Sequence, residues 1–132
     1  MAISDRNGLP IAAGIASGQR HESKLVEDTI DQRFIEELPE RLIGDKAYDS
    51  DPLDAQLLEQ YGIDMIAPNL SSRKKQSQDR RKLRRYKRRW LVERLFAWLL
   101  RFRRVNTRYE YKAENYLGFV LLGCIVILLK RL

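Results

Sequence analysis

Positive charge is concentrated in one part of this 132-residue chain, and this limits how the chain can fold. Residues 73–104 (the basic segment) contain 15 Lys and Arg against two Asp and Glu, a net charge of +13. The whole chain has a net charge of +7, so the other residues carry a net charge of −6. Bulky apolar side chains are interleaved with the positive charges, namely Tyr86, Trp90, Phe96, Trp98 and Phe102. This pattern predicts a long basic helix with an apolar face packed on a core, rather than a disordered tail.

The composition is that of a folded domain of the reducing cytosol. Hydrophobic residues make up 44% of the chain, which is enough to form a core. A single Cys excludes an internal disulfide, and one His with one Cys excludes a Cys/His metal cluster. The first residues show no signal-peptide pattern, so we expect a cytoplasmic protein. A basic segment of this density is typical of proteins that bind the phosphate backbone of nucleic acids.

Hydrophobic periodicity and turn signals predict one α/β domain over residues 1–132. Asn7-Gly8 is typical of the tip of a β-hairpin. After the hairpin, helices alternate with strands, which is typical of helices packed on a sheet. Strands are expected to end at residues 16, 45 and 67, and helices are expected at residues 23–39, 52–60, 79–104 and 113–131, with a polar loop at 68–78.

The chain closes with an apolar run at residues 116–129, between Glu114 and Lys130. A helix that crosses a bilayer needs about 20 apolar residues, so this run is too short. Its apolar residues lie all round a helix, which predicts a buried core helix and no membrane contact. Within it, Cys124 is expected to be a small buried hydrophobic residue rather than a nucleophile.

Asp45 is a candidate metal ligand. It ends the apolar strand that contains Leu42 and Ile43, and sites in open α/β sheets form at the carboxyl ends of strands. The alternative for Asp45 is a cap for the turn that follows. Asp49 and Asp51 come next and are expected to shape this turn and to cap the helix before Pro52.

Glu93 is the second candidate, because it is the only acidic residue between Arg80 and Arg104. On a helix it shares a face with Tyr86 and Arg89. The alternative is an ion pair of Glu93 with Arg89 or Arg94, which contributes only a few tenths of a kcal/mol. Two-metal phosphodiester chemistry needs clustered carboxylates in a positive surround, and Asp45 with Glu93 meets part of that requirement.

Three blocks of sequence form an ordered set along the chain. They are residues 1–14 (MAISDRNGLPIAAG), residues 44–51 (GDKAYDSD) and residues 86–104 (YKRRWLVERLFAWLLRFRR). With this set the chain resembles the C-terminal part of a DDE transposase of bacterial insertion sequences, of the group like insertion sequences 4 and 5. The resemblance implies an RNase H-like mixed sheet flanked by helices. It covers almost all of the chain.

The resemblance also implies roles for individual residues. Asp45 would be the second catalytic Asp and Glu93 the catalytic Glu, and both would bind Mg²⁺ or Mn²⁺. The implied DNA-binding residues are Tyr86, Arg89, Arg94, Arg101, Arg103 and Arg104. The family has a Lys seven residues after the Glu, where this chain has Leu100 with Arg101 beside it.

In the family, the first catalytic Asp belongs to a strand that would precede Met1, and Asp5 in the hairpin turn does not replace it. We therefore expect an N-terminally incomplete domain that is inactive alone. The implied partners are DNA, both insertion-sequence ends and target, and the upstream transposase segment or a second copy. The implied location is the cytoplasm, at the bacterial nucleoid.

Two other functions fit part of the sequence. One is a DNA-binding module without catalysis, such as a regulator derived from a transposase. The other is a structural RNA-binding protein of the ribosomal kind, which requires only the basic segment. The GDKAYDSD block argues against the RNA-binding protein, because such a protein needs neither Asp45 nor Glu93.

Overall fold

A β-hairpin opens the structure, a computed structural model that describes residues 1–74 and 80–131. Strand β1 (Ala2–Ser4) runs antiparallel to β2 (Pro10–Ala13), which confirms the predicted hairpin. In the turn, Asp5 accepts two backbone hydrogen bonds at 2.8 Å, and Gly8 has a φ of +78°. The second strand ends at Ala13, three residues earlier than predicted, where Ala13 pairs with Ala2 at the start of β1.

A second sheet contains the strand that leads to Asp45. Strand β3 (Arg41–Ile43) is parallel to β4 (Asp64–Ile66), and helix α2 (Asp51–Tyr61) connects them. Gly62 ends α2 in the left-handed conformation, with a φ of +67°. The α/β class is therefore confirmed. The described residues form two separate two-stranded sheets, where the sequence predicts one mixed sheet.

The first helical segment is shorter than predicted. A 3-10 turn, η1 (Glu22–Leu25), leads into α1 (Val26–Asp31), where the sequence predicts a helix that extends to residue 39. The amide of Phe34 instead donates to the carbonyl of Ile11 at 2.8 Å, so the chain leaves the helix and follows the outer edge of β2. Backbone pairing with a distant strand therefore ends this helix, although apolar residues continue at helical spacing.

The prediction of one continuous basic helix over residues 79–104 is wrong, because the helix is interrupted and α4 ends at Leu99. The described part consists of α3 (Arg80–Leu83), the 3-10 segment η3 (Arg84–Arg89), α4 (Trp90–Leu99) and, after a turn, α5 (Arg103–Asn106). The predicted start at Asp79 and the end of the polar loop at Gln78 lie outside the described residues. Like charges three and four residues apart repel each other and weaken an α-helix at η3, which contains no acidic residue.

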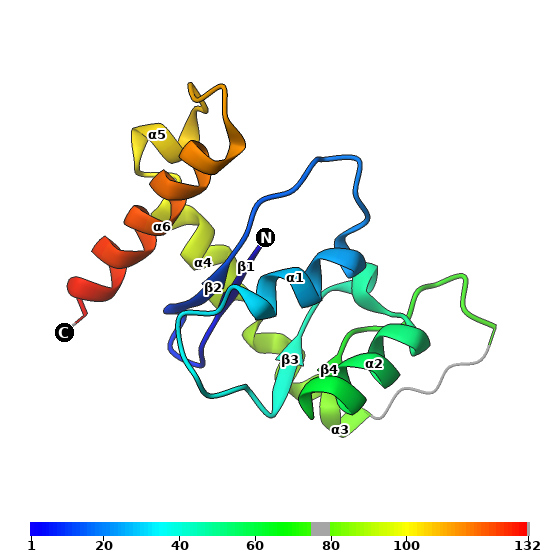
Figure 1. Ribbon diagram of the computed structural model, residues 1–132. Helices are drawn as coiled ribbons and strands as arrows, with labels where there is room; N and C mark the ends of the chain where they lie inside the picture. The colour runs from blue at the N-terminus through cyan, green and yellow to red at the C-terminus, as the bar shows by residue number, and fades with distance from the viewer. Residues whose placement is uncertain (75–79, 132) are drawn as a thin grey trace.

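Two hydrophobic clusters form the core. One joins α1, α2 and the β3–β4 sheet with Ile3 and Ala12 of the hairpin, and the other joins the hairpin residue Ala13 with α4 and the C-terminal helix α6 (Ala113–Leu129). Figure 1 shows α4 and α6 together on one side of the hairpin, and α2, β3 and β4 on the other. The core around α4 is centred on Leu95 and Leu99, which are 0% and 2% exposed. The basic segment thus has the predicted apolar face.

Helix α6 is only partly the buried helix that its sequence predicts. It buries Cys124 and Ile127 on the face toward α4, and the prediction for Cys124 as a small buried residue is confirmed. Burial raises the pKa of the Cys124 thiol to about 11, so the thiol stays protonated at neutral pH. The opposite face is exposed, including Leu122 and Ile125, because no described element covers it. Within the described residues, no helix is both long and apolar enough to cross a membrane.

Candidate functional site

Asp45 lies directly beyond the carboxyl end of the β3–β4 pair. Gly44 separates it from β3, and Asp45 then caps the 3-10 turn η2 (Lys46–Tyr48), with its Oδ1 accepting from the Ala47 amide at 2.9 Å. Gly44 has to be glycine here, because a Cβ at this position would lie 2.7 Å from the ring of Tyr48. The close approach of strand and turn thereby holds Asp45 at the strand end. The turn-cap interpretation of Asp45 is confirmed, while its role as a metal ligand stays a prediction.

The ring of Tyr48 lies against Gly44, and its hydroxyl is influenced by the Asp45 carboxylate. Burial raises the pKa of the Tyr48 hydroxyl to about 12, and the neighbouring carboxylates of Glu22 and Asp45 add to the shift. Tyr48 therefore stays neutral and protonated at physiological pH. It contributes packing and a hydrogen bond with Glu22, not charge, to the surroundings of Asp45.

Glu93 lies in the first turn of α4, at the end of a row of side chains formed by Tyr86, Arg89 and Glu93 (the Tyr–Arg–Glu row). Arg89 donates through Nη2 to Glu93 Oε1 at 2.7 Å and through Nη1 to the Tyr86 hydroxyl at 3.0 Å. The spacing expected from the sequence thus brings these three side chains together. The Glu93 side chain is 58% exposed, so its ion pair with Arg89 leaves the second oxygen accessible.

The two carboxylates are carried by neighbouring parts of the fold. Segment η3, which carries Tyr86 and Arg89, contacts β3, and α4 contacts β1. Among the residues that the structure describes, no three Asp, Glu, His or Cys side chains gather closely enough to hold a metal ion. Asp45 and Glu93 therefore have no third ligand of these types beside them in this part of the chain.

Arg94 has structural partners in addition to its predicted role on DNA. Its guanidinium lies between the rings of Trp90 and Trp98, 4.8 Å and 4.7 Å from their centroids. It also donates to the backbone carbonyl of Asn7 at the hairpin tip. Arg94 thereby fastens the hairpin to α4, and this occupies part of its hydrogen-bonding capacity.

The remaining predicted DNA contacts, Arg101, Arg103 and Arg104, are all exposed and differ in their ion pairs. Arg101 lies in the turn after α4 and Arg103 at the start of α5. Arg104 pairs with Glu110 at 2.9 Å, and the Glu110 side chain is only 7% exposed. The Arg104 guanidinium is therefore partly used within the protein, and the roles of all three on DNA stay predictions. Leu100, where the family has a Lys, is 52% exposed.

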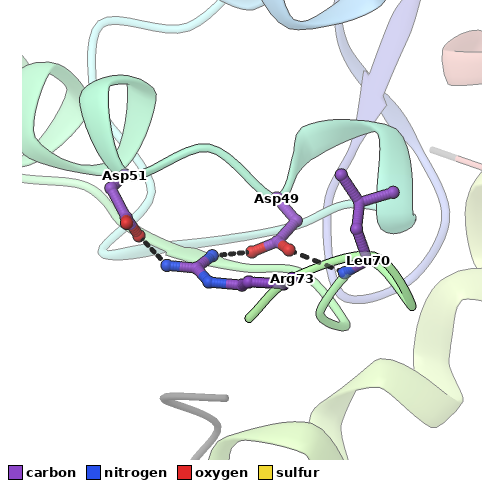
Figure 2. A network of polar contacts seen from close by, with 4 residues as sticks. All are labelled: Asp49, Asp51, Leu70 and Arg73. Atoms are coloured by element: carbon purple, nitrogen blue, oxygen red, sulfur yellow. Dashed lines mark hydrogen bonds and ion pairs between the residues drawn. The ribbon is translucent and has the colours of Figure 1, made fainter. Parts of the chain in front are cut away.

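A polar network near Asp45 was missed from the sequence (Figure 2). Asp49 accepts from the Leu70 amide at 2.7 Å and from Arg73, which also pairs with Asp51. Neither acid serves as the predicted cap, since the N-cap of α2 is Ser50. No local spacing signals this network, because its partners are 21 to 24 residues apart.

Comparison with known proteins gives matches to one family. Residues 1–129 match the family model described as a transposase DDE domain. The chain belongs to the DDE transposase family. It is 29% identical, over 133 residues, to the transposase described for insertion sequence element IS402 of Burkholderia cepacia. That alignment covers 95% of this chain and 59% of the relative, so the chain spans about three-fifths of the relative's length. No solved structure gives a significant match.

Within this DDE transposase chain, the matched range includes both blocks that carry the candidate carboxylates, residues 44–51 and 86–104. Membership of the family, which the sequence predicts, is therefore confirmed. The individual roles of Asp45 and Glu93 stay predictions, since family membership alone does not test them.

Another carboxylate of this DDE transposase chain, Asp54, is expected to make the stability of the fold depend on pH. Burial and the nearby Asp51 and Asp49 raise the pKa of Asp54 to about 6, from an ordinary value of 3.8. The folded state then holds a proton that the unfolded state has lost, so this group makes stability fall as pH rises from about 4 to 6. We expect Asp54→Asn to remove this fall and to stabilise the fold at pH 7.

Urea unfolding at pH 4, 5, 6 and 7 checks this expectation. The matched control is Asp28→Asn, at an exposed carboxylate that pairs with Arg20. Equal pH profiles for the Asp54 variant and the unchanged chain would contradict the shifted pKa.

Proposed function

We propose that the chain is the C-terminal part of a DDE transposase catalytic domain that cleaves insertion-sequence DNA and joins it to target DNA with divalent metal ions. The observation that carries the proposal is the family match over residues 1–129. Within that match, Asp45 follows β3 and Glu93 ends the Tyr–Arg–Glu row. In this proposal Asp45 and Glu93 are metal ligands.

The donor atoms of the two carboxylates fit Mg²⁺ or Mn²⁺. Asp45 uses Oδ1 for the Ala47 amide and Glu93 uses Oε1 for Arg89, so each has a second oxygen to offer an ion. Hard oxygen ligands suit these ions, which keep several waters when few carboxylates bind them. Divalent ions at such a site would supply Lewis-acid activation of the nucleophile, water or a DNA 3′-hydroxyl, and neutralise charge on the phosphate. Arg89 orients Glu93 by holding its other oxygen.

We further propose that a strand from outside this chain completes an RNase H-like sheet. In the described residues, β1 pairs only with β2 and β3 only with β4, so each has an edge with no strand on it. One inserted strand would join the two pairs into a single mixed sheet and bring the first catalytic Asp beside Asp45. The chain covers 59% of its relative, which leaves room for such a segment.

The proposed partner is DNA, bound through its phosphates. The exposed Arg101 and Arg103 and the row residues Tyr86 and Arg89 would contact the backbone near Glu93. A transposase that acts on bacterial DNA works in the cytoplasm, at the nucleoid. Unpaired strand edges also favour association, so the upstream segment or a second copy is the expected protein partner.

A DNA-binding module without catalysis is the second candidate. The observation that favours it is the number of carboxylates, because two ligands in the described residues are fewer than two-metal sites use. Such a protein would bind DNA through the basic segment and regulate a complete transposase. Such a protein would not need Asp45 to bind a metal ion.

Metal binding by the chain separates the two candidates. Two carboxylates make a weak site, so we expect binding of Mn²⁺ with a Kd of about a millimolar. Asp45→Asn and Glu93→Gln should each abolish this binding, because either change leaves a single carboxylate. Titration of Mn²⁺ followed by electron paramagnetic resonance of the free ion measures it.

Asp28→Asn is the control, since it removes an exposed carboxylate that pairs with Arg20 and is not a proposed ligand. Mn²⁺ binding that survives both Asp45→Asn and Glu93→Gln would place the ion elsewhere and refute the proposed ligands.

A further inference from the structure

The turn that carries Asp45 is held at its far end by residues outside it. Turn η2 is only three residues long, with the Asp45 carboxylate capping its start and Asp49 at its end. The Asp49 side chain is 5% exposed, and both of its oxygens accept hydrogen bonds. Their donors, the Leu70 amide and the Arg73 guanidinium, belong to the loop that follows β4. Both oxygens of Asp49 are therefore engaged within the protein.

Arg73 connects three segments through one guanidinium, as Figure 2 shows. Its Nη1 donates to Asp49 at the end of η2, and its Nη2 donates to Asp51 in the first turn of α2. The two arms differ in exposure, because the Asp51 side chain is 75% exposed and the Asp49 side chain only 5%. The planar fork of an Arg side chain suits such a two-sided contact, which a Lys cannot reproduce.

The start of η2 is fixed by packing. Gly44 lies against the Tyr48 ring and the side chain of Met65 in β4. Both ends of the turn thus depend on the loop and strand of residues 64–73. A short turn held at both ends limits the orientations of the Asp45 carboxylate at its start.

We propose that Asp49 and Arg73 are positioning residues for Asp45, which fix the turn so that the Asp45 carboxylate faces the proposed metal site. The inference rests on the proposed function for the role of Asp45, and on the network alone for the geometry. Arg73, although it begins the basic segment, is used inside the protein rather than on DNA. Groups that orient a metal ligand typically change metal affinity about 10–100-fold when they are removed.

The test compares Arg73→Gln and Asp49→Asn with Asp51→Asn, which removes only the exposed arm. The first readout is hydrogen exchange of the Ala47 amide, which donates to Asp45 Oδ1 and so reports the cap directly. We expect its protection to fall about tenfold in Arg73→Gln and Asp49→Asn, and about twofold or less in Asp51→Asn. The amide of Cys124 in α6, in the other core cluster, should keep its protection in all variants.

The second readout is Mn²⁺ affinity, expected to fall about tenfold in the same two variants. Arg73→Lys keeps the charge but not the fork, so it should restore only part of both losses, and it replaces Arg73→Gln if that variant unfolds. Unchanged Ala47 protection would overturn the proposal, and so would lost protection with unchanged Mn²⁺ affinity. If the unchanged chain shows no Mn²⁺ binding that depends on Asp45, the proposed function fails, while the Ala47 result still decides whether Arg73 holds the turn.

Discussion

The 132-residue chain alone is expected to leave insertion-sequence DNA uncut in Mg²⁺, and an upstream segment with the first catalytic Asp is expected to restore cleavage. The reason is the number of ligands, because the described residues bring no third carboxylate to Asp45 and Glu93. In the restored protein, Asp45→Asn or Glu93→Gln should lower the cleavage rate by about a thousandfold, as expected when a group that stabilises transition-state charge is lost. Nicking of end-labelled DNA that carries the insertion-sequence terminus measures this rate.

One control variant and one further expected result accompany this test. Asp28→Asn should leave the restored activity unchanged, since that carboxylate only pairs with Arg20 on the surface. The added segment should also reduce self-association, because it would cover the open edges of β1 and β3. Rapid cleavage by the unextended chain would contradict the account, because a third ligand would then have to come from within it. Asp49 would be the first residue to test in that case, although Leu70 and Arg73 donate hydrogen bonds to its two oxygens.

The affinity of the chain for duplex DNA is expected to fall about a thousandfold between roughly 50 and 200 mM salt. This corresponds to a slope of about −5 in the plot of log affinity against log salt, if about six positive groups displace counterions. Fluorescence anisotropy with a labelled duplex gives the slope. A slope near zero would contradict binding of DNA phosphates by the basic segment.

Individual arginines should contribute to this slope according to their surroundings. Replacing the exposed Arg101 and Arg103 with Gln should flatten it by about two units, one for each lost phosphate contact. Arg104→Gln should change it by less than one, because Arg104 pairs with the nearly buried Glu110. Lys24→Gln, at an exposed position in η1, is the control and should have no effect. Equal contributions from all four positions would mean that the charge acts only as a diffuse field.

Local sequence signals predict those parts of the fold that depend on local interactions. Asn7-Gly8 gives the hairpin turn because its glycine adopts the required positive φ. The apolar strand before Asp45 and the apolar helix α6 follow from runs of hydrophobic residues. The Tyr–Arg–Glu row is also predicted, since residues three and four apart meet on any helix.

Features that depend on contacts between residues far apart in the chain are not predicted from the sequence. The helix predicted to residue 39 ends at Asp31, because the backbone beyond it pairs with β2. The basic helix ends at Leu99, and Phe102, in an extended conformation, packs its ring against Gly123 of α6. The bridge from Arg73 to Asp49 joins residues 24 positions apart, a pairing that no periodic pattern encodes.

The central claim, that Asp45 and Glu93 bind the same divalent ion, is tested most directly by paramagnetic broadening of backbone amide signals during a Mn²⁺ titration. The amide of Ala47, two residues after Asp45, reports on Asp45, and the amide of Arg94, directly after Glu93, reports on Glu93. The account predicts that both signals broaden along one binding curve and that Asp45→Asn or Glu93→Gln abolishes the broadening of both. Broadening of only one signal, or broadening that survives these substitutions, would contradict a shared site.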